Sequence, residues 1–203
     1  VDGPSWTQAE ANSVKLGGHL AAVGSSDENQ FLSQTFSTDS AAKWLGLREV
    51  SGEGDWQWTS GDSLEYTNWI YDPNIAWSDN AQEPNNWQGK NEQYAFMYFH
   101  SSNGYDYSGG WADAMGNSTD RGIAETSFIR RGDSAYVIVQ GPTWEEAEAN
   151  AVKLGGHLVT INDAEENEWL SNQSWNGGPS LYIGYSDRIK EGEWRWADGS
   201  SSD

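Results

Sequence analysis

Apolar residues recur at helical spacing near the start of the chain. Trp6, Ala9 and Val14 fall mostly on one helical face, a capping pattern begins at Ser5, and two glycines at 17–18 end the run. The pattern predicts an amphipathic helix of about three turns.

The same capping pattern at Ser25 predicts a second helix, with Phe31, Leu32 and Phe36 pointing inward. Elsewhere the spacing changes to short apolar runs or strict alternation, bounded by turn residues, as is typical of β-strands. These patterns predict strands at residues 19–23, 44–47, 56–58, 94–99 and 122–129.

Residues 64–91 show almost no periodicity and are rich in Asn, Asp, Trp and Pro. An irregular segment of this length inside a compact domain is usually functional. This loop is therefore expected to contain the binding site.

The first part of the chain is repeated later. GPSWTQAEANSVKLGGHL at 3–20 matches GPTWEEAEANAVKLGGHL at 141–158, and the match runs without a gap over 63 positions at an offset of 138 residues. A repeat of this length suits a globular domain rather than a solenoid unit. We interpret residues 1–131 as one domain and residues 134–203 as a truncated second copy.

Between the two copies, the sequence predicts a β-hairpin from strands at 123–129 and 136–139. The first copy lacks an opening strand of its own. Residues 134–139 are therefore candidates to complete it.

Charge and composition narrow the function classes. The chain has 31 acidic and 11 basic residues, a net charge of −20, which argues against nucleic acids and anionic membranes and suits a protein that meets divalent cations. The absence of cysteine excludes disulfides and thiolate metal sites. No apolar run is long enough for a membrane span and no signal peptide is visible, so we expect any export signal to lie outside this sequence.

The chain contains 13 tryptophans, which predicts a loop-rich fold held by large aromatic anchors. The core tryptophans are expected to be Trp44, Trp56, Trp58, Trp69 and Trp111. His19 and His157, which occupy equivalent positions of the repeat, are expected to be buried and structural.

The order of these features resembles the C-type lectin-like domain. WLGL at 44–47, Glu-Pro-Asn at 83–85 and Trp-Ala-Asp at 111–113 have the order and spacing typical of that family. The resemblance implies an α+β fold in which two helices flank small antiparallel sheets and a long loop binds the ligand. The family's usual disulfides are absent, which is compatible with a tandem bacterial type.

The resemblance also implies a calcium site in the long loop. Calcium takes six to eight oxygen ligands, and Glu83, Asn85, Glu92 and Asp113 would supply them. A cis bond between Glu83 and Pro84 would point the first two of these side chains the same way. Taken without the surrounding motifs, residues 83–86 also have the composition of an ordinary turn, because Pro and Asn are common turn residues.

In the family, two sugar hydroxyls complete the calcium coordination and bond to the same side chains, here Glu83, Asn85 and Glu92. The Glu-Pro-Asn order is the family's pattern for mannose, glucose or fucose. Trp87 would stack on the sugar ring, whereas Trp77 is expected to pin the loop to the domain.

The sequence allows two alternatives to a single site that binds calcium and sugar. Ala112 replaces an Asn that in the family binds both calcium and sugar, so a cation site without sugar binding is an alternative. A second calcium site, by family position, would use Glu49, Glu53 and Asn86 together with Glu92.

No nucleophile–base pairing or phosphate loop is visible, so we expect no enzyme. The leading hypothesis is a calcium-dependent carbohydrate-binding module, of a secreted or cell-surface protein with many repeats, whose partner is a glycan or polysaccharide. The alternative is a structural or adhesive repeat of an extracellular filament, sheath or giant surface protein, in which neighbouring copies are the partners. An ice- or mineral-binding variant of the fold is a third hypothesis.

Overall fold

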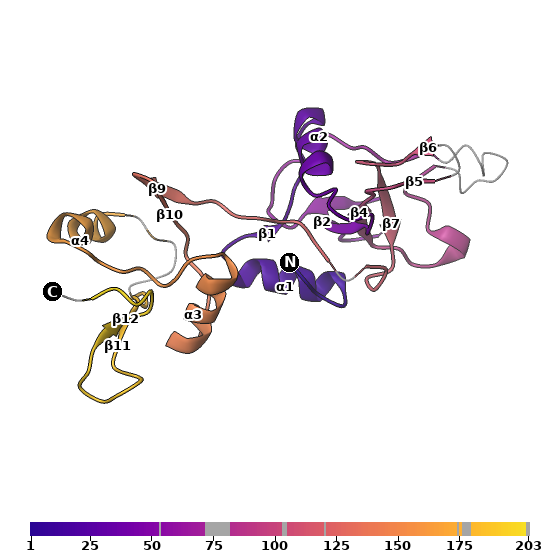
Figure 1. The fold of residues 1–203 in the computed structure, drawn as a ribbon. Helices are drawn as coiled ribbons and strands as arrows, with labels where there is room; N and C mark the ends of the chain where they lie inside the picture. Colours follow the sequence, from indigo (N-terminus) through magenta and orange to yellow (C-terminus); the bar gives the residue numbers. More distant parts are fainter. Residues whose placement is uncertain are drawn as a thin grey trace. The chain divides into compact units, whose positions relative to one another are not determined.

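The computed structural model describes residues 1–52, 54–71, 82–102, 105–119, 121–173, 175 and 180–201. These residues form two compact units, each described by itself (Figure 1). The first comprises Val1–Val14 and Gly18–Glu125, and the second comprises Lys15–Gly17 and Thr126–Asp203. The division into domains at 1–131 and 134–203 stays a prediction.

The first unit combines helices with small antiparallel sheets, which is the α+β architecture that the sequence predicts. Its elements are α1 (Trp6–Lys15), β1 (His19–Leu20), α2 (Ser26–Thr35), β2 (Lys43–Glu49), β3 (Trp56–Trp58), the 3₁₀ helix η2 (Trp87–Gly89), β4 (Tyr94–Met97), β5 (Ser101–Ser102), β6 (Tyr105–Asp106), β7 (Trp111–Ala114) and β8 (Ala124–Glu125). None of the described helices, in either unit, is long and apolar enough to cross a membrane.

Side-chain caps begin both helices of the first unit, as predicted. The hydroxyl of Ser5 accepts a hydrogen bond from the Gln8 N–H (3.3 Å), and that of Ser25 accepts one from the Glu28 N–H (3.2 Å). Each bond satisfies an N–H that the helix itself leaves without a partner.

The prediction that Phe31 points inward is wrong, because its side chain is 62% exposed. Asn29 and Leu32 instead form the buried face of α2. The Asn29 amide accepts a hydrogen bond from the Trp111 indole (2.8 Å) and donates one to the Gly109 carbonyl (3.0 Å). A buried polar residue with both bonds made therefore occupies the inward position.

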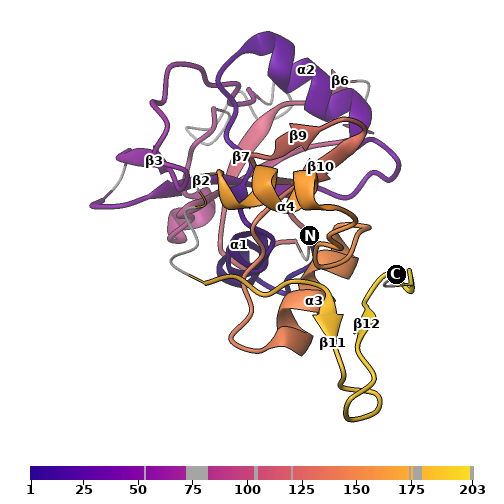
Figure 2. The ribbon, with the colours of Figure 1, turned by 90° about the vertical axis from the view of Figure 1, so that its left-hand side faces the viewer.

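The main sheet has the strand order β3-β2-β4-β7, and every pair is antiparallel. Leu45 and Leu47 of β2 face one apolar cluster together with Trp111, whereas Trp44 faces a second cluster together with Trp6. Figures 1 and 2 show α2 and α1 on opposite sides of this sheet. Of the five predicted core tryptophans, four are at most 8% exposed, and Trp69 is partly buried against the first cluster.

The second unit contains a hairpin, two helices and a short strand pair. Its elements are β9 (Ile129–Arg131), β10 (Ser134–Tyr136), α3 (Trp144–Lys153), α4 (Ala164–Ser171), β11 (Tyr185–Ser186) and β12 (Arg195–Trp196). Strands β9 and β10 form the predicted hairpin, although both strands are shorter than expected and lie closer to the turn.

Contacts of the first unit recur in the second at the offset of the sequence repeat. Strand β11 pairs with β12 through Tyr185 and Trp196, as β2 pairs with β3 through Leu47 and Trp58. The indole of Trp6 donates to the Leu45 carbonyl at 2.8 Å, and the equivalent indole of Trp144 donates to the Ile183 carbonyl at 2.8 Å.

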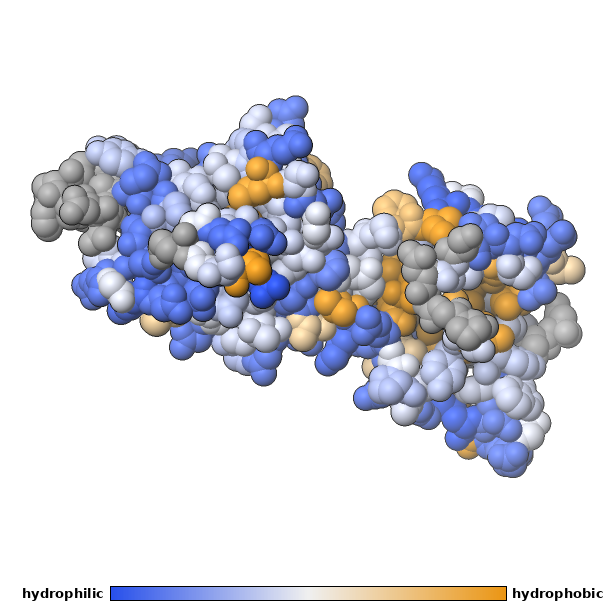
Figure 3. Space-filling view, turned by 180° about the vertical axis from the view of Figure 1, so that it is seen from behind, coloured by the Kyte–Doolittle hydropathy of each residue, from blue (hydrophilic) through white to orange (hydrophobic). Residues whose placement is uncertain are grey.

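The two units differ in how well the repeated residues are covered. Leu45 is fully buried and Trp56 is 8% exposed, whereas the equivalent Ile183 and Trp194 are 38% and 51% exposed. In the first unit, β4 and β7 complete the sheet beside β2, and the described residues of the second unit contain no such strands. Hydrophobic side chains accordingly gather at the surface of the second unit, on the right of Figure 3.

The two histidines of the repeat are structural, but the prediction that they are buried is wrong, since each side chain is 43% exposed. The Nδ1 atom of His19 lies 2.6 Å from Oε1 of Glu10, and His157 lies at the same distance from Glu148. In each copy, a glutamate rather than the core therefore holds the ring.

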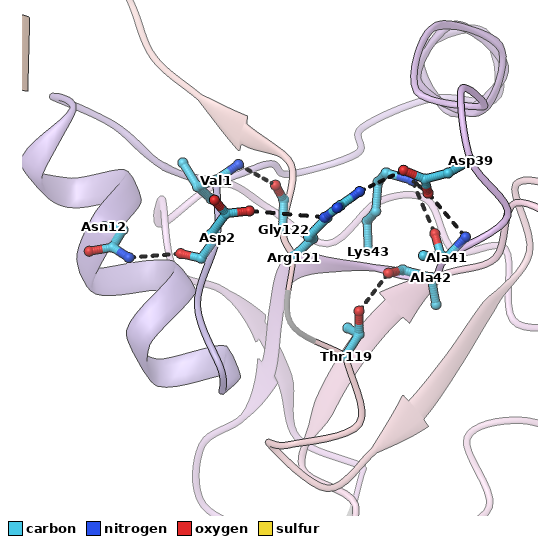
Figure 4. A network of polar contacts seen from close by, with 10 residues as sticks. All are labelled: Val1, Asp2, Asn12, Asp39, Ala41, Ala42, Lys43, Thr119, Arg121 and Gly122. Atoms are coloured by element: carbon cyan, nitrogen blue, oxygen red, sulfur yellow. Dashed lines mark hydrogen bonds and ion pairs between the residues drawn. The ribbon is translucent and has the colours of Figure 1, made fainter. Parts of the chain in front are cut away.

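A polar network ties the first residues of the chain to the end of the first unit (Figure 4). The terminal amino group of Val1 donates to the Gly122 carbonyl (2.8 Å), and Asp2 bridges to Arg121. Arg121 also contacts Asp39 (2.6 Å), whose carboxylate holds Lys43 at the start of β2 (2.9 Å). This network fixes the edge of the unit away from the long loop.

Candidate functional site

The described arms of the long loop, 64–71 and 82–91, are irregular, as predicted, and are paired to strand β7. The Ile70 N–H donates to the Trp111 carbonyl (2.9 Å), and the Glu83 N–H donates to the Ile70 carbonyl (3.0 Å). The first arm thus lies between β7 and the second arm. This pairing places the arm that carries Glu83 on the side of the sheet that β7 forms, the strand that contains Asp113.

Asp113 and Glu92 hold the second arm by its backbone. The Asp113 carboxylate accepts hydrogen bonds from the N–H groups of Asn85 (2.9 Å) and Asn86 (3.0 Å). The Glu92 carboxylate accepts one from the Trp87 N–H (2.5 Å), and the Glu92 N–H donates to Oδ1 of Asn86 (2.7 Å). The loop that the sequence marks as functional is therefore closed around two carboxylates.

The peptide bond between Glu83 and Pro84 is cis, as the resemblance implies. Asn86 and Gln88, on either side of Trp87, have positive φ angles of 47° and 58°. Residues other than glycine adopt this region at a cost and do so mostly where function or packing requires it.

Three acidic side chains interact in this loop. Burial raises the pKa of Glu83 to about 10, helped by a hydrogen bond to Asp113 and by the charges of Asp113 and Glu92. Burial also raises the pKa of Glu92, an effect that the hydrogen bond from the Trp87 N–H and, to a smaller extent, the charge of Lys90 partly offset. Within the described residues, no ion pair joins any of the three to a basic side chain.

The chemistry of this donor set suits calcium. Glu83, Glu92 and Asp113 supply carboxylates and Asn85 an amide, which are ligands that calcium prefers. The Oε2 atom of Glu83 is buried and has no hydrogen-bond partner among the described residues, as expected of an oxygen that serves a cation. Across the described ranges, however, no three His, Cys, Asp or Glu side chains have the spacing of a metal site. Backbone N–H groups hold two of the carboxylates instead.

Trp87, the residue expected to stack on a sugar, begins η2 and is 37% exposed. Part of its indole is therefore accessible beside the carboxylates. Trp77 lies outside the described residues.

Ala112 is 2% exposed and packs in the apolar cluster that contains Trp44 and Phe96. Its side chain offers no oxygen, so the departure from the family pattern noted in the sequence removes a ligand that nothing at this position replaces.

The second calcium site stays a prediction. Glu49 is 7% exposed, and its Oε1 accepts a hydrogen bond from the Gly54 N–H (2.7 Å) in its own turn. Glu53 lies outside the described residues. Asn86 bonds to Glu92 within the first site, a role that the sequence did not indicate, although an Asn directly after Pro-Asn is a frequent turn former.

Comparison with known proteins gives the family. The model of the lectin C-type domain family matches residues 2–121 and 140–203, which is most of the chain. The chain belongs to the C-type lectin domain family. This membership supports the expectation of a carbohydrate-binding protein rather than an enzyme.

Individual relatives are distant. Human C-type mannose receptor 2 is 25% identical over 212 residues, which span 97% of this chain and 14% of the receptor. This chain therefore covers only a small part of the C-type lectin relatives that it matches.

Solved structures of the same fold are also similar. The carbohydrate-recognition domain of cow CD23, solved in the presence of a GlcNAc2Man3 oligosaccharide, is 30% identical with a TM-score of 0.46, over 60% of this chain and 78% of that chain. A calcium-independent type II antifreeze protein is 24% identical with a TM-score of 0.43, over 58% of this chain and 75% of that chain.

Proposed function

We propose that this C-type lectin domain is a calcium-dependent carbohydrate-binding module for mannose-, glucose- or fucose-type sugars. Glu83, Asn85, Glu92 and Asp113 would hold the cation. Glu83, Asn85 and Glu92 would also bond to the sugar hydroxyls, and Trp87 would cover a face of the ring. When bound, calcium would supply a positive charge to which sugar hydroxyls can coordinate.

The observation that carries this proposal is the group of three interacting acidic side chains, none of which forms an ion pair with a basic side chain among the described residues. Burial and the nearby charges of Asp113 and Glu92 disfavour the ionised form of Glu83, so the three side chains repel one another when all are ionised. A divalent cation would remove this repulsion and would give Glu83 Oε2 a partner. The family, whose members bind carbohydrate, supports reading the group as a sugar site.

The parent protein is proposed to be secreted or at the cell surface and to carry several domains of this tandem, cysteine-free bacterial type, with domains at 1–131 and 134–203. Several weak sites on one chain would bind a polysaccharide more tightly than one site, because the second binding event is intramolecular.

Calorimetric titration tests the cation first. Calcium is expected to bind with measurable heat and to raise the melting temperature, and EGTA should reverse both effects. Glu83→Gln removes one ligand charge and should weaken calcium binding at least about tenfold, or about 1.4 kcal/mol. The matched control Glu65→Gln, at an exposed acidic residue, should bind calcium as the wild type does. The proposal would be contradicted if calcium binding gave no heat and if EGTA did not change the melting temperature.

Titrations with saccharides in the presence of calcium test the proposed sugar binding. Mannose, glucose or fucose should bind only when calcium is present. Trp87→Ala should weaken sugar binding and leave calcium binding unchanged, because the indole contributes ring contact and no cation ligand. Calcium binding without any sugar binding would point to the effect of Ala112.

A structural or adhesive repeat is the second candidate. Sedimentation and electron microscopy of the full-length protein should then reveal ordered assemblies, with neighbouring copies as partners. Purely monomeric behaviour would exclude this candidate.

A further inference from the structure

A cleft of about 320 Å³ lies in the first unit between α1 and the edge of the main sheet. Its volume falls at the lower end of the range of about 300–1,000 Å³ for small-molecule sites. None of its lining residues belongs to the long loop. The lining residues are Trp6, Glu10, Arg48, Val50, Gln57, Trp58 and Thr59.

Two donor groups of the cleft lack partners within the described chain. The backbone of Arg48 is paired to β3 and β4, but its side chain is exposed and its guanidinium makes no ion pair with another described residue. Thr59 also lines the cleft, and its hydroxyl is buried without a hydrogen-bond partner among the described residues, so its side chain would have to rotate for the hydroxyl to face a ligand. A buried hydroxyl without a partner costs free energy unless water or a ligand reaches it.

Glu10 supplies a fixed acceptor on the opposite wall. Its two oxygens are held by His19 (2.6 Å) and by the Leu20 N–H (2.8 Å), so the carboxylate cannot swing away from the cleft. A carboxylate oxygen with one hydrogen bond can still accept another. The charges of Glu10 and Arg48 offset each other, so a neutral ligand suits the cleft better than an ion.

Apolar groups complete the lining. Trp6, Trp58 and Val50 all line the cleft; the two tryptophans are each 4% exposed, and Val50 is 49% exposed. Donors and acceptors beside apolar side chains match the hydroxyls and C–H groups of a sugar ring. We propose that this cleft is a second saccharide site, which binds a neutral pyranose without a metal ion.

The repeat provides an internal comparison. The equivalents of Trp6, Glu10 and Trp58 are again Trp, Glu and Trp, whereas Arg48 and Thr59 become Ser186 and Ala197. The scaffold of the cleft is thus repeated, and the two donors without partners are particular to the first unit. The double variant Arg48→Ser/Thr59→Ala gives the first unit residues that the second unit already uses, so it should fold.

The test is a nuclear magnetic resonance titration of the whole chain in EGTA, with methyl α-mannopyranoside and methyl β-glucopyranoside as probes. We expect shifts of the Trp6 and Trp58 indole signals and of the Arg48 side-chain N–H signal, without calcium. Arg48→Ser/Thr59→Ala should weaken this binding at least about tenfold. Arg195→Ser, which removes a 63% exposed guanidinium, should leave it unchanged.

Three outcomes would overturn the proposal. The first is the absence of cleft shifts at tens of millimolar glycoside, and the second is equal shifts in the double variant. The third is a stronger response to glucuronate than to the neutral glycosides, which would mean that Arg48 selects anions. Since EGTA removes calcium throughout, none of these results depends on the proposed site in the long loop.

Discussion

Glu83 combines two properties that are rarely found together in one exposed loop, burial and proximity to further acids. Burial and the neighbouring Asp113 raise its pKa to about 10, so the side chain carries a proton at neutral pH in the absence of a cation. Calcium would favour the ionised form. Proton and cation therefore compete for the same carboxylate.

This competition predicts a pH dependence for the calcium-free protein. The pKa of Glu83 is about 10 in the folded state, compared with 4.5 for the unperturbed group. The folded state therefore binds more protons than the unfolded state between these values, so stability is greatest below the lower one and falls as pH rises towards the upper one. Thermal melting at pH 5, 7 and 9 should show this decline, and Glu83→Gln should flatten it. An equal decline in the variant would assign it to other groups.

At the scale of elements, a glutamate on each repeated helix joins it to the segment that follows. Glu10 accepts the Leu20 N–H at 2.8 Å, and Glu148 accepts the Leu158 N–H at 2.8 Å. Both amide groups belong to residues that are at most 8% exposed. The glutamate carboxylate thus acts as the hydrogen-bond acceptor that a neighbouring strand would otherwise supply, for an N–H group that water does not reach.

Removing this acceptor should destabilise each unit locally. Glu10→Ala and Glu148→Ala are each expected to cost about 1–3 kcal/mol, because a buried N–H loses a charged partner. Hydrogen exchange should accelerate at Leu20 in the first variant and at Leu158 in the second. The exposed control Glu65→Ala should change neither rate. Faster exchange of both amides in either single variant would contradict a local role.

Local patterns explain what the sequence could and could not predict. The Ser25 cap and the β2 strand follow from residues close together in sequence, and both form as predicted. The inward face of α2 was misassigned because apolarity favours Phe31, whereas the bonds of Asn29 to distant residues decide the packing. Likewise, the motif indicates Glu83, but its burial depends on pairing between segments far apart in the chain.

At the scale of the whole molecule, the two units contain equivalent residues in unequal surroundings. Leu45 lies in a sheet that β4 and β7 extend and is fully buried, whereas Ile183 is 38% exposed. The same backbone contact, from a tryptophan indole to the carbonyl of each residue, is nevertheless kept. The two units therefore share the backbone geometry at this position, but the side chains of Leu45 and Ile183 differ in burial.

Truncation at these two positions should have unequal effects. Leu45→Ala is expected to cost about 2–5 kcal/mol, because it opens a cavity in a packed core. Ile183→Ala should cost less than about 1 kcal/mol, because its side chain already contacts solvent. Hydrogen exchange, followed separately in the two units, measures each effect. Similar losses would mean that Ile183 is covered in solution.

The shared pairing of β2 with β3 and of β11 with β12 also concerns the order of folding. Tyr185 meets Trp196 as Leu47 meets Trp58, at the offset of the sequence repeat. The register that the two units share follows from the residues that they share within the hairpin. The hairpin closes a short loop, whereas β4 must return from a distant part of the chain, and short closures lose less entropy. The hairpin can therefore form first and serve as the template on which the rest of the first unit assembles.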